Sequence, residues 1–107
     1  MDRPLFTALV REPSMSPTLR DGDAILVRRT TRIRPGQVVV VRFDGQPGLY
    51  VKRAVRSVDG LWWVEGDNAL ASDDSRRYGP ARVVGRAVLR WWPRLTWLRA
   101  RSQHPDH

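Results

Sequence analysis

Serine and lysine are the residue types through which this chain could do covalent chemistry. Its 19 basic residues are 18 arginines and one lysine, Lys52. The chain has no cysteine, and both histidines, His104 and His107, lie among the last four residues. A cysteine nucleophile and thiolate metal ligands are therefore excluded, and a Ser-His-Asp triad within the folded body is not expected. A serine nucleophile in this chain would need lysine as its base.

Lys52 has the sequence context that a lysine base requires. It lies within an expected strand over 49–58, where the period of two places Tyr50 and Ala54 on the same face. A lysine with a pKa of about 10.4 is protonated at neutral pH, but burial can lower that pKa by up to about 3 to 5 units. Arginine cannot act in this way, because guanidinium keeps its proton. A single lysine on a strand is more often a solvated charge, so the assignment depends on a serine partner.

The elements that must position these residues are strands. Turn signals precede several β-branched or aromatic runs, and together they predict a mainly β, barrel-like domain. Asp59-Gly60 is a two-residue turn typical of hairpins, so 50–58 and 61–65 are expected to pair antiparallel. We expect one domain over 1–93 and a basic, partly disordered tail over 94–107. The expected strands are 24–27, 38–43, 49–58, 61–65 and 83–89.

Two segments, 12–19 and 66–76, are rich in hydroxyl groups and small residues and fit neither strands nor ordinary turns. Side-chain to backbone hydrogen bonds can hold such loops in one shape, and functional sites are often built from loops on a rigid scaffold. Asp67, Asp73 and Asp74 lack the ligand spacing of an EF-hand loop, so we expect no metal site.

Three motifs, in order along the chain, resemble the motif set of type I signal peptidases. They are SMSPTL at 14–19, YVKR at 50–53, and a loop that combines GDN at 66–68 with SDDSR at 72–76. The resemblance spans about residues 10–90. It implies a single signal-peptidase/LexA-type catalytic domain and a serine endopeptidase that uses a Ser-Lys dyad and no cofactor.

The resemblance implies a role for each matching residue. Ser14 would be the nucleophile, Lys52 the general base, and Ser72 the residue that hydrogen-bonds the lysine and orients it. Asp74 and Arg76 would brace the loop by an ion pair.

The oxyanion hole is where the sequence departs from the family. The backbone N–H of Ser14 would contribute to it. Many family members have serine or glycine two residues before the nucleophile, whereas this chain has Glu12. An ionised carboxylate cannot donate a hydrogen bond, so a side-chain donor is not expected at that position.

Segments outside the three motifs narrow the resemblance to one branch of the family. The sequences at 62–68, 78–80, 84–88 and 90–93 are similar to those of small soluble proteases that mature nickel-type superoxide dismutase. This similarity implies that the partner is the superoxide dismutase precursor, from which a short N-terminal leader is removed. The nickel would then belong to the substrate. The alternative is signal-peptidase-like processing of another precursor.

The net charge of +8 is also compatible with a non-enzymatic function, that of a basic module that binds nucleic acid. A self-cleaving repressor domain would use similar Ser-Lys chemistry, but this chain has a short N-terminal arm and no evident Ala-Gly scissile segment. We therefore favour the hypothesis of a leader-removing protease over that of a self-cleaving repressor domain.

The segment 82–101 contains six arginines, three tryptophans and no acidic residue. One interpretation is weak contact with an anionic membrane surface through Arg90, Trp91, Trp92 and Trp97. The interpretation that we favour from the sequence is that the tryptophans cap a small core while the arginines stay solvated.

The apolar runs of the chain are short. None approaches the roughly 20 residues that a membrane-spanning helix needs, and no secretory signal pattern is present at the N-terminus. We therefore expect no transmembrane segment and a cytoplasmic location, with peripheral membrane contact as the further option.

Overall fold

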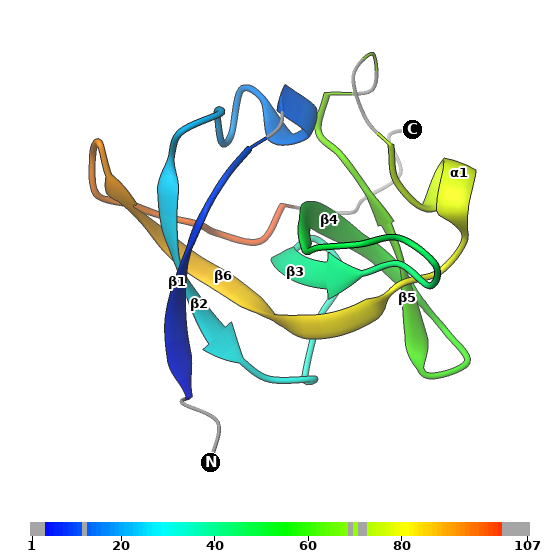
Figure 1. Ribbon diagram of the computed structural model, residues 1–107. Helices are drawn as coiled ribbons and strands as arrows, with labels where there is room; N and C mark the ends of the chain where they lie inside the picture. The colour runs from blue at the N-terminus through cyan, green and yellow to red at the C-terminus, as the bar shows by residue number, and fades with distance from the viewer. Residues whose placement is uncertain (1–3, 12, 69, 71–72, 102–107) are drawn as a thin grey trace, which may run out of the picture.

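The computed structural model describes residues 4–11, 13–68, 70 and 73–101, and this part of the chain is mainly β (Figure 1). Its strands form one antiparallel sheet in the order β1-β2-β6-β3-β4-β5, and β7 pairs with β6 outside this path. The strands are β1 (Leu5–Leu9), β2 (Ala24–Arg29), β3 (Val38–Arg42), β4 (Tyr50–Val58), β5 (Leu61–Glu65), β6 (Arg82–Trp92) and β7 (Thr96–Trp97). Of the two short helices, η1 (Pro13–Met15) lies within the predicted irregular segment 12–19, and α1 (Ser75–Tyr78) begins at the end of the segment 66–76 and extends past it.

The sheet curls so that part of it closes on itself. The order of neighbouring strands in this part is β6, β3, β4 and β5. A β-bridge between Trp62 of β5 and Ala81, the residue before β6, connects the last of these strands back to the first. The hairpin turn at Asp59 and Gly60 joins β4 to β5, with both residues at positive φ. The predicted mainly β, barrel-like class and the predicted hairpin are therefore confirmed.

Strand β3 separates two hydrophobic cores. Because side chains alternate along a strand, Val38 and Val40 enter one core while Val39 and Val41 enter the other, and all four are almost fully buried. The first core also contains Val10, Met15, Leu19, Ile25, Val27 and Ala87. The second core also contains Phe43, Ala54, Val64 and Ala81, with Tyr50 and Tyr78 packed against it.

The residues after β6 return to the sheet. Strand β7 pairs with β6, opposing Trp97 to Leu89, and the Leu98 backbone N–H donates to the Val88 carbonyl over 2.9 Å. The Arg101 N–H then donates to the Gly36 carbonyl over 2.9 Å. Residues 96–101 are thus held by backbone hydrogen bonds at both ends, to β6 at one end and to Gly36 at the other.

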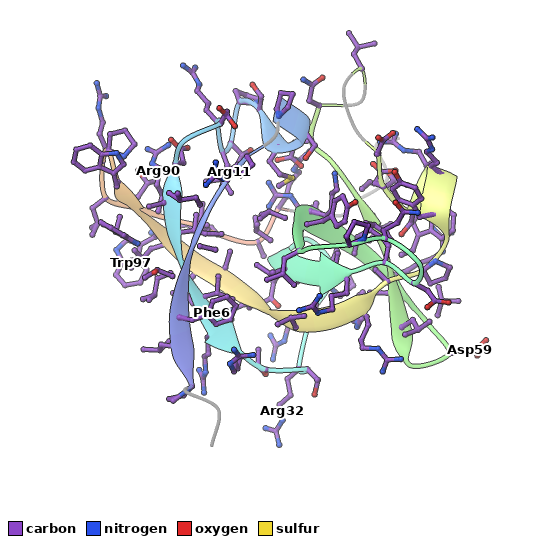
Figure 2. The ribbon with its side chains drawn as sticks, viewed as in Figure 1. Phe6, Arg11, Arg32, Asp59, Arg90 and Trp97 are labelled. Atoms are coloured by element: carbon purple, nitrogen blue, oxygen red, sulfur yellow. The ribbon has the colours of Figure 1, made fainter. Side chains whose placement is uncertain are left out.

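The exposure of the C-terminal tryptophans corrects one expectation. Trp91, Trp92 and Trp97 are 46%, 58% and 59% exposed, so these rings do not cap a core. Leu98 packs against the first core instead. Trp91 and Trp92 are the last two residues of β6, and Trp97, labelled in Figure 2, ends β7.

Candidate active site

Ser14 is held in place by the residues that follow it. It lies in the middle of η1 and is only 3% exposed. Met15 and Leu19 are fully buried in the first core, and the Leu19 N–H donates to the Met15 carbonyl over 2.9 Å. Burial of these two apolar side chains fixes the short helix against the sheet, because withdrawing either would expose it to water.

Lys52 lies in the interior of the sheet. It is fully buried in β4, opposite Val39 of β3, and its Nζ lies 5.7 Å from the centroid of the Tyr50 ring. Ala54 belongs to the second core and Tyr50 packs against it, so these two residues share a face of the strand, as the period of two predicts. This lysine is therefore not the solvated surface charge that single strand lysines usually are.

The structure brings the serine helix and the lysine strand together. Helix η1 packs against β4. Ser14 lines a small cleft of about 50 Å³ between β1 and the start of β4, together with Leu9, Val10, Arg11, Leu49, Tyr50 and Val51. Lys52 follows Val51 directly in β4 and is fully buried, but it does not line this cleft.

The loop after β5 contacts the serine segment directly. The Asn68 backbone N–H donates to the Ser14 carbonyl over 2.8 Å, and its Nδ2 donates to the Pro13 carbonyl over 3.3 Å. The segments 14–19 and 66–68, which are about 50 residues apart in sequence, are therefore in contact through main-chain and side-chain hydrogen bonds.

Asp67 connects four separate segments. Its carboxylate accepts from Arg53 Nε and Nη2, over 3.1 and 2.7 Å, and from the Thr18 hydroxyl over 2.6 Å. It also pairs with Arg101. Burial acts to raise the pKa of Asp67, but the hydrogen bonds from Arg53 and Thr18 and the charges of Arg53 and Arg101 outweigh it, and the pKa lies below its ordinary value.

We call the group of Thr18, Arg53, Asp67 and Arg101 the Asp67 cluster. The side chains of Arg53 and Asp67 are 8% and 4% exposed, and Arg53 Nη1 also donates to the Gly36 carbonyl over 2.9 Å. The sequence pointed to Asp67 as part of the GDN motif and as a rejected metal ligand, but it did not reveal this cluster. Nothing in the linear spacing signals it, because its members come from four segments that only the fold brings together.

Asp74 and Arg76 form a second ion pair. The Asp74 carboxylate is fully buried, caps α1 by accepting from the Arg76 N–H, and also accepts from Arg76 Nη2 over 2.6 Å. It accepts from the Gly66 N–H as well, over 2.8 Å. The hydrogen bond from Arg76 to Asp74 raises the pKa of the Arg76 guanidinium. This pair therefore ties the start of α1 to the end of β5.

Two of the predicted site residues, Ser72 and Glu12, lie outside the described residues. In the part of the chain that is described, no group of three acidic or histidine residues is arranged to hold a metal ion. None of the described helices has the length and apolar character that crossing a bilayer requires.

The structure thus combines a mainly β domain with a buried serine in η1 and a buried lysine in β4, the strand against which η1 packs. The chain belongs to the Peptidase S24-like family, whose model matches residues 1–88. The expected relation to signal peptidases is confirmed at the level of the family, because the relatives include protease subunits and a signal peptidase.

Three relatives illustrate the range of the similarity. The mitochondrial ATP-independent inner membrane protease subunit 1a of Arabidopsis thaliana is 36% identical, with 83% of this chain and 71% of the relative covered. The mitochondrial inner membrane protease subunit 2 of Danio rerio is 31% identical, covering 98% and 74%. The probable signal peptidase I-1 of Synechocystis is 32% identical, covering 71% of this chain and 40% of that protein.

Proposed function

We propose that this chain is a serine endopeptidase in which Ser14 is the nucleophile and Lys52 the general base. The observation that carries the proposal is the full burial of the single lysine in β4, the strand against which the serine helix packs. Burial disfavours the charged ammonium, which is the condition that allows a lysine to accept a proton at neutral pH.

In the proposed reaction, Lys52 takes the hydroxyl proton of Ser14 as the serine oxygen attacks the scissile carbonyl. The tetrahedral intermediate breaks down when Lys52 gives this proton to the departing amine, which leaves an acyl-enzyme. Lys52 then accepts a proton from the attacking water and gives it to the Ser14 oxygen as the bond from that oxygen to the acyl carbon breaks, which releases the acid product and restores the serine hydroxyl and the neutral lysine. The Ser14 N–H would donate to the oxyanion, and the ionised Glu12 carboxylate would not.

The remaining site residues would act by positioning. We assign Ser72 to orient the Lys52 amine, and Asp74 with Arg76 to brace the loop that carries it. The contacts of Asp74 with Arg76 and with the Gly66 N–H support the bracing role. A loop fixed at both ends loses little freedom when substrate binds, which keeps the reacting groups aligned.

We further propose that the substrate is a precursor protein from which an N-terminal leader is removed, and that this precursor is nickel superoxide dismutase. The relatives named above are protease subunits and a signal peptidase, which supports precursor processing. The similarity of 62–68 and 90–93 to the nickel-type maturation proteases supports the particular substrate.

Co-expression with the precursor tests both parts of this proposal. The wild-type chain should release a mature N-terminus whose mass identifies the cleavage point, whereas Ser14→Ala and Lys52→Arg should abolish release while remaining folded by circular dichroism. Ser57→Ala, at an exposed position of β4, is the matched control and should cleave normally. Cleavage by either site variant at the wild-type rate would refute the dyad.

The substrate and the dyad can fail separately. If the wild-type chain leaves the superoxide dismutase precursor intact but cuts another leader-bearing precursor in a Ser14-dependent way, the dyad stands and the named substrate is wrong. If no tested precursor is cut, hydrolysis of generic peptide esters by wild type but not by Ser14→Ala still reports on the dyad.

A second proposed property, contact with an anionic membrane surface, is supported by the exposed face around β6 and β7. Leu9, Trp91 and Trp92 line an open groove of about 420 Å³ on this face, and Leu95 is 65% exposed. Arg90 is engaged within the fold, since it contacts Asp23 over 3.4 Å and donates to the Arg94 carbonyl. The tryptophans, rather than Arg90, would therefore contact the lipid.

Sedimentation with vesicles of phosphatidylcholine and phosphatidylglycerol tests this contact. Trp91→Ser with Trp92→Ser should reduce the bound fraction severalfold. Leu70→Ser, which removes a 99% exposed apolar side chain from another loop, should leave it unchanged. Absence of binding by the wild-type chain would refute the membrane contact without bearing on the dyad.

A further inference from the structure

Four arginines surround a groove at the end of the sheet that lies away from η1. Arg28 of β2, Arg86 of β6, and Arg32 and Arg34 of the connection between β2 and β3 line a hollow of about 450 Å³. Figure 2 shows Arg32 pointing outward at this end, while η1 lies at the opposite end of the view. We call these four residues the arginine groove.

The arginines of the groove have no carboxylate partner among the described residues. The ion pairs of the described chain belong to the arginines at positions 53, 76, 77, 90 and 101. Arg28 and Arg86 also lie directly opposite each other in the β2–β6 register. Like charges at such positions destabilise a sheet, and a bound anion would relieve that repulsion.

The loop that forms one wall of the groove is held by its own hydrogen bonds. The Arg32 N–H donates to the Thr30 hydroxyl and the Arg34 N–H to Gln37 Oε1, each over 3.0 Å. Gly36 in the same loop donates to the Ala54 carbonyl of β4 over 2.8 Å. The backbone that carries the cations is therefore ordered before any ligand binds, which lowers the entropic cost of binding.

The groove continues into a second hollow of about 430 Å³ that shares Gln37 and Arg86 with the first. This extension adds Arg99 and the 59% exposed ring of Trp97. Figure 2 shows Trp97 beside the end of β6. A line of cations thus leads to an exposed aromatic face, and Trp97 has space for a planar group to lie against it.

We propose that the arginine groove binds a chain of phosphate groups, and that the ligand is single-stranded nucleic acid. Guanidinium groups match phosphate oxygens through paired N–H donors, and four of them without carboxylate partners can neutralise several successive phosphates. Trp97 would stack on a base, which free polyphosphate lacks. This inference goes beyond the proposed peptidase activity and does not depend on it.

Fluorescence anisotropy with a labelled dodecathymidylate at low salt tests the proposal. The wild-type chain should bind, and Arg28→Gln with Arg86→Gln should weaken binding by about tenfold. The slope of log affinity against log salt should become shallower by about 1.4, as expected for the loss of two contacts to a single strand. Trp97→Ala should weaken binding to the oligonucleotide but leave competition by inorganic triphosphate unchanged.

The chain supplies a control with the same change of charge. Arg42 and Arg82 also oppose each other across two strands, in the β3–β6 register, but their hollow includes Asp44. Arg42→Gln with Arg82→Gln should therefore alter the affinity by no more than about twofold, as expected for charges outside the contact. Both double variants should cleave a leader as the wild type does, because none of these residues is placed in the catalytic machinery.

Several outcomes would overturn the proposal. Equal loss of affinity in the two double variants would show attraction by net charge alone. Binding of triphosphate without binding of the oligonucleotide would assign the groove to a small phosphate ligand instead. Equally tight, Arg28-dependent binding of oligoglutamate would show that the groove recognises acidic peptide rather than phosphate.

Discussion

Two regions of the molecule differ in how their charged side chains are partnered. In the Asp67 cluster and the Asp74–Arg76 pair, buried carboxylates contact arginines from the same loop or from other parts of the fold. At the arginine groove, four cations face a hollow and form no ion pair with a described carboxylate. Buried, paired charges position the backbone, whereas exposed and unpaired charges remain available to a ligand.

The largest expected effect comes from breaking the Asp67 cluster. Asp67→Asn keeps the side-chain shape but leaves Arg53 buried without its countercharge, which should lower the free energy of unfolding by about 3 to 5 kcal/mol. Urea denaturation followed by tryptophan fluorescence measures the change. Asp44→Asn, at an exposed position, is the control and should change stability by less than about 0.5 kcal/mol. A loss below about 1 kcal/mol for Asp67→Asn would remove the contrast between the Asp67 cluster and the arginine groove.

The attachment of the C-terminal segment can be broken at Gly36. This residue has φ of +94°, and an added Cβ would overlap the Arg101 carbonyl. Gly36→Ala should therefore cost about 2 to 3 kcal/mol and detach residues near Arg101 from the Asp67 cluster. Gly48→Ala has a similar φ of +82° and no atom within 4 Å of the added Cβ, so it should cost only about 1 kcal/mol. Equal losses in the two variants would show that the contact with Arg101 adds nothing.

Acid titration gives a smaller effect at the same cluster. The folded pKa of Asp67 is lowered, so the stability that its charge provides is present above the unfolded value of about 3.9 and is lost as the pH falls through the folded pKa. The wild-type chain should lose more stability than Asp67→Asn between pH 5 and the acid limit. Parallel pH profiles for the two proteins would contradict this account.

The smallest expected effect lies at the arginine groove and has the opposite sign. Arg28→Gln with Arg86→Gln removes a repulsion between opposed cations, so the free energy of unfolding should rise by a few tenths of a kcal/mol, up to about 1. The gain should shrink at high salt, because salt already screens exposed charges. Thermal melts at low and high ionic strength measure it, and a loss of stability would show that these arginines contribute packing instead.

Much of the sheet could be predicted from the sequence because its strands follow turn signals. The runs at 24–27, 38–43, 49–58, 61–65 and 83–89 all fall on strands, with shifts of a few residues at their ends. Strand β1 lacks a preceding turn signal, and exposed residues alternate with partly exposed ones along it. Strand β7 has two residues, too few to show a period. Strand β1 is defined by its pairing with β2, and β7 by its pairing with β6. Such long-range pairing leaves no pattern in the sequence of the strand itself.

The site was predicted less completely, for a different reason. Residue types alone were enough to single out Lys52 as the one side chain able to act as a base, and its burial fits that prediction. The Asp67 cluster depends on Thr18, Arg53 and Arg101. These residues are far apart in the sequence and come into contact only because the sheet curls. Any of the 18 arginines would have looked equally suitable as a partner for Asp67 in the linear sequence.

The double-sided burial of β3 has a consequence for the packing around the proposed dyad. Ser14 is anchored through Met15 in the first core, and Lys52 is flanked by Tyr50 and Ala54 in the second. The valines of β3 contribute side chains to both of these cores. A methyl group gained or lost in Val38–Val41 would therefore disturb the packing around one anchor or the other of the proposed dyad, without changing either Ser14 or Lys52.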